Sequence, residues 1–168
     1  MSEEINSHTI AVLVENEFGV LARVAGMFAG RGFNIDALSV APTPDPKVSR
    51  ITLVTHGNEQ IIEQILKQLN RLVDVLKVVD LSSEDRVRRE LMLVKVRTQN
   101  GQQDVVEKIL KDFRGTLLEQ EKNIFILEFI QEHLQNDEVI RRLGALEILE
   151  TARSGNLAMQ KGKRVLSA

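Results

Sequence analysis

The sequence predicts an α+β fold in which a βαββαβ order of elements occurs twice. Stretches of β-branched and apolar residues, typical of strands, are separated by stretches whose apolar residues recur at helical spacing. The same order returns after a short, highly charged stretch at 82–90. An element order of βαββαβ is the split βαβ pattern, so we predict two tandem ferredoxin-like domains.

The first half contains four predicted strands and two predicted helices. The strands are 8–15, 33–41, 48–56 and 73–81, and the prolines of 42–47 favour a hairpin loop between the second and third. Apolar residues at helical spacing predict one helix after the first strand and another after the third. These residues are Val20, Leu21, Val24, Ala25 and Phe28 in the first helix and Ile61, Ile62, Ile65, Leu66 and Leu69 in the second.

The second half repeats this order. Strands are predicted at 91–98, 115–121, 124–132 and 145–152. The helix stripes comprise Val105, Val106, Ile109, Leu110 and Phe113, and then Val139, Ile140 and Leu143. We therefore divide the chain into a first domain at 1–81, a charged linker at 82–90, a second domain at 91–157 and a basic tail at 158–168.

The composition indicates a globular protein without an extended basic surface. Of the 168 residues, 43% are hydrophobic and 27% are charged, enough to form a core and a polar surface. The net charge of -2 predicts no general attraction to nucleic acid or to anionic lipid. Cysteine is absent, the first residues do not resemble a signal peptide, and the apolar runs are too short for a membrane helix. We expect a cytoplasmic protein with neither nucleic acid nor membrane as a partner.

The sequence offers no catalytic or metal site. His8, His56 and His133 are far apart and show no metal-ligand spacing. The nucleophile elbow, the phosphate-binding loop and the dinucleotide fingerprint are all missing, as are Trp and Tyr. We interpret the runs of carboxylates as solvated surfaces. The chain is therefore predicted to be non-catalytic, with no metal and no cofactor of its own.

The stretch ENEFG, residues 15–19, leads from the first strand into the first helix. The first N–H groups of a helix lack helical partners, and this end of the helix dipole favours an anion. Gly19 permits a sharp turn and close approach of a ligand, and the amide of Asn16 both donates and accepts hydrogen bonds. This combination suits an α-amino acid, whose side chain Val20 and Leu21 could contact.

A purely structural interpretation competes with this one. Asn16 could simply cap the helix while Gly19 permits the turn. Asn34 could likewise be an ordinary polar residue at the start of a strand. Taken alone, the residue chemistry favours the structural interpretation.

Longer motifs change this balance. The stretch AVLVENEFGVLARVAGMFAGRGFNIDALSVAPT, followed by SRITLVTHG, resembles the ACT domain of the regulatory (small) subunit of acetohydroxyacid synthase, also called acetolactate synthase. Further motifs, LVDV, RREL, FRG and ARSG, are similar to later landmarks of that family, so the resemblance spans roughly residues 8–155. It identifies the first domain as an ACT domain and the second as the family's C-terminal domain.

The resemblance implies a regulatory role in branched-chain amino-acid biosynthesis. In this family the large catalytic subunit carries thiamine diphosphate, a divalent metal such as Mg²⁺, and FAD. The small subunit activates it and confers feedback inhibition, usually by valine. ACT domains of two chains pair side by side as a homodimer, with the effector at their interface. By this resemblance one chain supplies Asn16 and Gly19, and its partner supplies Asn34 and Ile35. The candidate effector-binding residues are Asn16, Glu17, Phe18, Gly19, Val20, Leu21, Asn34 and Ile35.

Two other functions stay open at the level of sequence. One is a stand-alone ACT-type amino-acid-sensing or transcription-linked protein, although no helix-turn-helix segment or basic face supports DNA contact. The other is an enzyme, which the missing nucleophile, metal ligands and cofactor motifs disfavour. Phe18 stands where relatives often have a small residue or Pro, which bears on the choice among valine, leucine and isoleucine.

Overall fold

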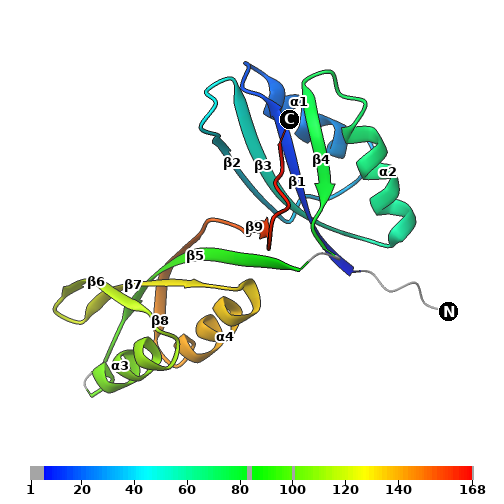
Figure 1. Ribbon diagram of the computed structural model, residues 1–168. Coiled ribbons are helices and arrows are strands. Elements are labelled where there is room, and N and C mark those ends of the chain that lie inside the picture. The colour runs from blue at the N-terminus through cyan, green and yellow to red at the C-terminus, as the bar shows by residue number, and fades with distance from the viewer. Residues whose placement is uncertain (1–5, 83–84, 100, 168) are drawn as a thin grey trace. The chain divides into compact units, whose positions relative to one another are not determined.

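A computed structural model describes residues 6–82, 85–99 and 101–167. The chain forms two compact units (Figure 1). Unit 1 contains the residues up to Val87 together with those from Asn156 onward, and unit 2 is Arg88–Gly155. Each unit has an antiparallel sheet covered by two helices, so the predicted α+β fold with two ferredoxin-like domains is confirmed.

Unit 1 has the strand order β2-β3-β1-β4, which places β1 and β3 in the middle of the sheet and β2 at one edge. Its central strand β1 pairs antiparallel with β3 along its whole length and with β4 over its second half. The elements are β1 (Asn6–Glu15), α1 (Val20–Ala29), β2 (Ala37–Pro42), β3 (Val48–Gly57), α2 (Glu59–Leu69) and β4 (Val75–Asp80).

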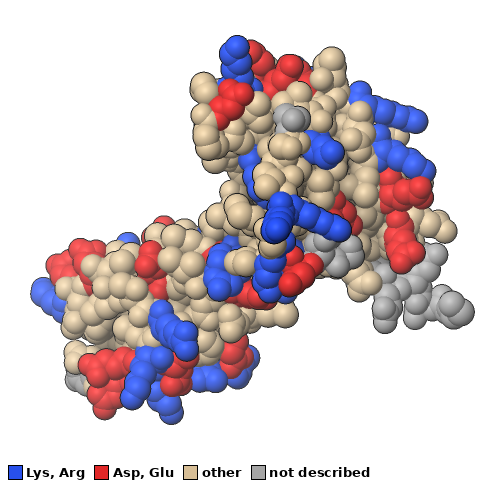
Figure 2. All heavy atoms as spheres, viewed as in Figure 1, with Lys and Arg blue, Asp and Glu red and all other residues tan. Residues whose placement is uncertain are grey.

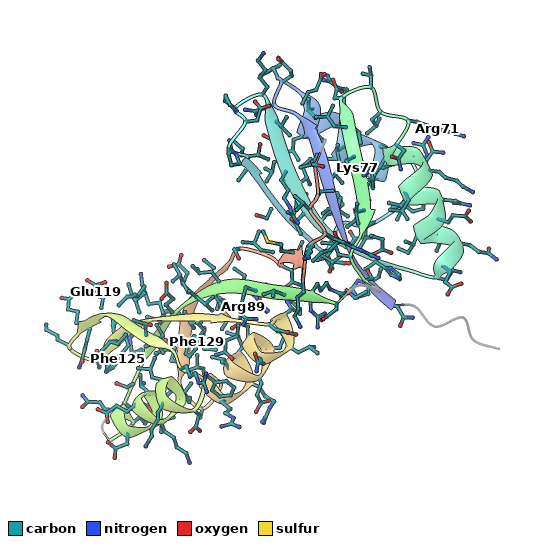
Figure 3. All side chains as sticks on the ribbon, in the orientation of Figure 1. Arg71, Lys77, Arg89, Glu119, Phe125 and Phe129 are labelled. Carbon is teal, nitrogen blue, oxygen red and sulfur yellow. The ribbon has the colours of Figure 1, made fainter. Side chains whose placement is uncertain are left out.

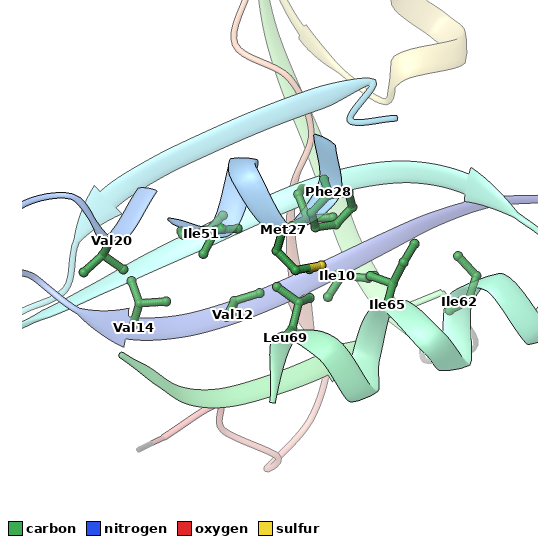
Figure 4. Packing of buried hydrophobic residues seen from close by; sticks show 12 residues of the cluster. Ile10, Val12, Val14, Val20, Met27, Phe28, Ile51, Ile62, Ile65 and Leu69 are labelled. Carbon is green, nitrogen blue, oxygen red and sulfur yellow. The ribbon is translucent and has the colours of Figure 1, made fainter. Parts of the chain in front are cut away.

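The core of unit 1 lies between the sheet and its two helices (Figure 4). The predicted stripe of α1 is partly wrong, because Met27 is buried while Leu21 is 40% exposed. Leu21 follows the first helical residue, where the chain is still emerging from the turn. The buried cluster comprises Ile10, Val12, Val14, Val20, Val24, Met27, Phe28, Ile51, Leu53, Ile62, Ile65 and Leu69.

Part of the other face of this sheet is covered by residues that follow unit 2 in the chain. Ala158 forms a buried cluster with Ala11 and Leu81, and Leu166 packs against it. The guanidinium of Arg50, on β3, donates to the carbonyl oxygen of Ala158 at 2.5 Å. Burial lowers the pKa of this guanidinium. The sequence predicts a basic tail without a strand at 158–168, whereas the structure contains β9 (Leu157–Gln160) and packs this segment onto unit 1.

Unit 2 has the strand order β6-β7-β5-β8. Phe125 and Phe129, labelled in Figure 3, belong to the buried cluster between sheet and helices. Strand β5 begins at Arg86, so the second half of the predicted linker 82–90 is strand. The elements are β5 (Arg86–Arg97), α3 (Gln103–Asp112), β6 (Thr116–Glu121), β7 (Ile124–Gln131), α4 (His133–Leu143) and β8 (Glu147–Arg153).

The surface carries charges of both signs. On the face of each unit shown in Figure 2, acidic and basic side chains are interspersed. Within the described ranges, no group of three or more His, Asp or Glu side chains is placed to hold a metal ion. None of the described helices is both long enough and apolar enough to cross a membrane.

Candidate functional site

The turn between β1 and α1 is held by two other loops of unit 1. The N–H of Glu15 donates to the carbonyl oxygen of Asp74, which precedes β4, at 2.9 Å. The N–H of Asn16 donates to the carbonyl oxygen of Lys47, in the β2–β3 loop, at 2.7 Å. The turn is therefore fixed by segments that come together only when the whole sheet has formed.

The side chain of Asn16 fastens this turn to the β2–β3 loop and to the start of β3. Its Nδ2 donates to the carbonyl oxygen of Pro46, and its Oδ1 accepts from the hydroxyl of Ser49, each at 2.9 Å. Helix α1 has Gly19 as its N-cap residue, with no capping hydrogen bond from a side chain. The capping alternative for Asn16 is therefore wrong. Since an amide oxygen accepts two hydrogen bonds, Asn16 retains one acceptor position.

Gly19 gives the turn its shape. Its φ of 84° lies in the left-handed region, which residues with a β-carbon rarely adopt. A β-carbon here would lie 3.2 Å from Nη1 of Arg23. Among the described residues, the N–H groups of Gly19, Leu21 and Ala22 have no hydrogen-bond acceptor. These free donors, together with the positive end of the helix dipole, suit a carboxylate.

An ion pair between Arg23 and Asp74, which the sequence analysis did not predict, supports the turn. The guanidinium of Arg23 donates through Nε and Nη2 to the carboxylate of Asp74, at 2.5 and 2.9 Å. The hydrogen bonds that Arg23 donates to Asp74 raise the pKa of the Arg23 guanidinium. Asp74 belongs to the LVDV motif, so that motif and the helix start at Gly19 meet at one place. Arg23 lies one helical turn after Gly19, and this spacing is the sequence signal that could have indicated its place beside the turn.

The remaining residues of the turn differ in exposure. Phe18 is fully exposed, and Glu17 is also on the surface. Leu21 is partly exposed next to the free N–H groups. Val20 is only 4% exposed and belongs to the core of unit 1. Its proposed contact with a ligand side chain is therefore not available in this structure.

Asn34 and Ile35 lie far from Asn16 within one chain. The N–H of Asp36 donates to the carbonyl oxygen of Val54, whereas Glu15 pairs with Val48 at the other end of β3. Six residues of strand correspond to ~20 Å. Ile35 is partly buried against the core, and Asn34 is exposed. The structure thus brings Asn16 and Gly19 together, and it places Asn34 and Ile35 at the opposite end of the sheet.

Unit 2 repeats the same turn in a more open form. The N–H of Thr98 donates to the carbonyl oxygen of Asn123 in the β6–β7 loop, at 2.8 Å, as Asn16 does to Lys47 in unit 1. Arg97 pairs with Glu147, the residue that begins β8. A cavity of about 670 Å³ lies here. Its lining residues are Arg97, Thr98, Gln99, Gly101, Gln103, Asp104, Asn123 and Glu147.

Two later sequence motifs also meet in unit 2. Glu90 of RREL is 2% exposed, and its Oε2 accepts from Nε and Nη2 of Arg153 in ARSG, at 3.0 and 2.5 Å. Nδ2 of the fully buried Asn136 donates to the same carboxylate oxygen at 3.1 Å. Burial raises the pKa of Glu90, but these hydrogen bonds outweigh it and hold the pKa below its ordinary value. The two motifs thus form one buried polar cluster.

The chain matches two protein families in succession. Residues 10–77 match the AHAS small subunit-like ACT domain, and residues 89–162 match the small subunit of acetolactate synthase. The chain is 39% identical over 158 residues to the acetolactate synthase isozyme 3 small subunit of Escherichia coli, covering 94% of this chain and 97% of that protein. The chain belongs to the acetolactate synthase small subunit family.

Other comparisons agree with this assignment to the acetolactate synthase small subunit family. The probable acetolactate synthase small subunit of Archaeoglobus fulgidus is 39% identical, with 94% of this chain and 98% of that protein covered. The crystal structure of the acetolactate synthase small subunit from Thermotoga maritima superposes with a TM-score of 0.86 at 34% identity, covering 95% of this chain and all of that chain. The family predicted from the sequence motifs is therefore confirmed.

Proposed function

We propose that this chain is a regulatory subunit of acetolactate synthase that activates the catalytic subunit and makes it sensitive to valine or a close branched-chain analogue. The relatives are named as small subunits, which supports a larger partner that performs the chemistry. Thiamine diphosphate, Mg²⁺ and FAD are expected on that catalytic subunit. This chain contributes binding and regulation to branched-chain amino-acid biosynthesis.

The observation that carries the proposal is the group of free N–H donors at the start of α1. The N–H groups of Gly19, Leu21 and Ala22 lie in a turn that Asn16 holds in place through Pro46 and Ser49. A carboxylate bound here accepts backbone hydrogen bonds at the positive end of the helix dipole. This geometry recognises the carboxylate group, which valine shares with every other α-amino acid.

Discrimination among amino acids then depends on the apolar contacts around the bound side chain. Leu21 and Phe18 are the exposed apolar residues of the turn, and Ile35 is partly buried at the other end of the sheet. One methylene group is worth only ~1–3 kcal/mol in such a pocket. Valine, leucine and isoleucine are therefore expected to compete, with modest differences in affinity.

A second copy of the chain completes the site. Strand β2 is at the edge of the sheet, so its outer backbone groups are free to pair with another strand. Antiparallel pairing of two β2 strands would place the start of one, near Asn34, beside the end of the other, near the β2–β3 loop. Asn16 binds that loop through Pro46. Asn34 and Ile35 of one protomer would thereby approach Asn16 and Gly19 of its partner.

A site divided between two protomers provides a physical basis for feedback. Binding of the effector stabilises one arrangement of the two ACT domains, and the catalytic subunit responds to that arrangement. The coupling free energy in such systems is typically ~1–3 kcal/mol, which changes activity or affinity about 5- to 150-fold.

The activity assay uses the purified chain and the catalytic subunit from the same source. Acetolactate formation is measured for the catalytic subunit alone, with the chain, and with the chain plus valine. We expect activation by the chain and inhibition of the activated complex by valine. Absence of activation together with absence of any valine response would reject the proposal.

The dimer is tested separately by analytical ultracentrifugation. Val40, on the edge strand β2, is 44% exposed. Val40→Glu places two like charges near each other if the β2 strands pair, which opposes pairing. We expect dimers for the wild-type chain and a larger fraction of monomers for this variant. An unchanged dimer would show that β2 is not the interface.

A further inference from the structure

Asn34 is held in position by a residue from the buried part of β3. The hydroxyl of Thr55, which is completely buried, donates to the backbone carbonyl oxygen of Asn34 at 2.6 Å. The N–H of Asp36 donates to Val54 at 2.8 Å. The backbone at 34–36 is therefore anchored on both sides of Ile35, although Asn34 is on the surface.

The carboxylate of Asp36 bridges two side chains. Its Oδ1 accepts from Nδ2 of Asn34 at 2.7 Å, and its Oδ2 lies 2.5 Å from Nδ1 of His56. His56 is at the end of β3, and half of its side chain is exposed. The bridge therefore joins the segment before β2 to the neighbouring strand β3. By the proposed function, this is where the effector bound at Gly19 of the partner protomer reaches this chain.

The contact with Asp36 determines which atom of the Asn34 side-chain amide, Nδ2 or Oδ1, is free to bind a ligand. A carboxylate only accepts hydrogen bonds, so Nδ2 of Asn34 must face Asp36 and Oδ1 must point away. Within the described part of the chain, Oδ1 of Asn34 has no hydrogen-bond donor. By contrast, Oδ1 of Asn16 already accepts from Ser49. Of the two asparagines, Asn34 thus offers the less occupied acceptor for an ammonium group.

We propose that Asp36 and His56 are positioning residues of the effector site, which hold Asn34 with Oδ1 directed at the ammonium group of the bound amino acid. This inference rests on the proposed function, because it takes Asn34 as part of the effector site. The negative charge of Asp36 also attracts the ammonium group through the amide that it orients. The ligand class is an α-amino acid with a free ammonium group, and carboxylates that lack this group gain nothing from the bridge.

His56 fixes the carboxylate of Asp36 from its second oxygen. Around His56, β1 presents Ser7 opposite it, β3 presents the uncharged Thr55 and Gly57, and α2 begins with the carboxylate of Glu59. Asp36 is the charged group in contact with the imidazole. Because the imidazole holds Oδ2 of Asp36, Oδ1 stays directed at the amide of Asn34.

The test measures binding of valine to the complete chain by calorimetry. For Asp36→Ala we expect valine affinity to fall about tenfold, the effect of one charge-assisted hydrogen bond at a solvated site. Asp36→Asn keeps the volume and loses the charge, so it should give a smaller loss. Asp36→Asn also keeps the inference testable if the alanine variant does not fold. Affinity for 3-methylbutanoate, which has no ammonium group, should stay within twofold in both variants by chemical-shift titration.

His56→Ala tests the second contact of the carboxylate. We expect valine affinity to fall about two- to fivefold when the hydrogen bond to Oδ2 of Asp36 is lost, while affinity for 3-methylbutanoate stays within twofold. The matched control is His8→Ala, because His8 also faces a carboxylate of the same domain, that of Asp80 at 3.1 Å. It should bind valine with wild-type affinity, and an equal loss in both variants would argue against the positioning role of His56.

The possible results separate this inference from the proposed function. Unchanged valine affinity in Asp36→Ala, with binding lost in Gly19→Asp, would overturn the positioning role and leave the site at the helix start intact. Equal losses of affinity for valine and for 3-methylbutanoate in Asp36→Ala would show a general structural effect, and this result would also overturn the positioning role. No valine binding by the wild-type chain would overturn both proposals.

Discussion

Replacing Gly19 by Asp tests the candidate site most directly. The change adds a β-carbon to a residue whose φ is 84° and places a carboxylate where we propose that the effector carboxylate binds. The new side chain would compete for the free N–H groups of Leu21 and Ala22 and would repel the ligand. We expect valine binding and feedback to be lost, while activation of the catalytic subunit is retained.

The structure gives the size of the accompanying loss of stability. The left-handed conformation costs a residue with a β-carbon ~1–2 kcal/mol. The new β-carbon also lies 3.2 Å from Nη1 of Arg23, a side chain that moves at small cost. A change of 1 kcal/mol shifts the midpoint of thermal unfolding by roughly 4–8 °C for a domain of 60–100 residues. We therefore expect unit 1 of Gly19→Asp to unfold roughly 5–15 °C below the wild-type chain.

Gly101→Asp is the matched control. Gly101 has a φ of 83° in the equivalent turn of unit 2, where a β-carbon would meet no atom within 4 Å. Gly101→Asp therefore introduces the same left-handed backbone strain and the same charge away from the candidate site. Calorimetry with valine and the acetolactate assay are applied to both variants. If Gly19→Asp binds valine with wild-type affinity, or if Gly101→Asp loses it equally, the helix start of α1 is not the effector site.

Three further predictions concern the hydrogen bonds of the two units. Asn16→Ala removes both bonds that fasten the turn to the β2–β3 loop and the start of β3, so valine feedback should be lost at a stability cost of about 1–2 kcal/mol, measured by urea unfolding and the acetolactate assay. Preserved feedback would show that the turn holds its shape without them. Arg153→Met leaves the charge of Glu90 buried without its main partner and should destabilise unit 2 by about 3–5 kcal/mol in the same urea measurement. A loss below 1 kcal/mol would contradict the buried pair. The lowered pKa of Glu90 means that its contribution is complete above its ordinary value of 4.5 and is lost as pH falls through the lower pKa of the folded state. Acid unfolding followed by circular dichroism should therefore begin at higher pH in Arg153→Met, and an unchanged midpoint would argue against this linkage.

The arrangement of elements was predictable because each one leaves a local pattern. The helical spacing of Ile62, Ile65 and Leu69 and the β-rich run before Asn16 depend only on neighbouring residues. Where the local pattern was ambiguous, tertiary packing decided the result. Leu21 fits the stripe of α1 as well as Met27 does. In the structure the turn at Gly19 leaves Leu21 exposed, whereas Met27 is buried in the core.

The candidate site was only partly predictable, because its residues are joined across the sheet. Free N–H groups at Gly19 follow from the strand-turn-helix pattern alone. The contacts of Arg23 with Asp74 and of Asp36 with His56 join residues 51 and 20 positions apart, and no local spacing reveals them. The capping alternative for Asn16 stayed open for the same reason, since its partners Pro46, in the β2–β3 loop, and Ser49, in β3, are distant in sequence.

Residues 156–167 belong to unit 1, although the whole of unit 2 precedes them in the chain. The bond between Arg50 and Ala158 joins positions 108 apart, with the whole of unit 2 between them. During synthesis Ala11 and Leu81 therefore stay uncovered until unit 2 has emerged from the ribosome. Cutting the chain after Gly155 therefore removes part of a core, and a separately expressed ACT domain would expose Ala11 and Leu81 to solvent.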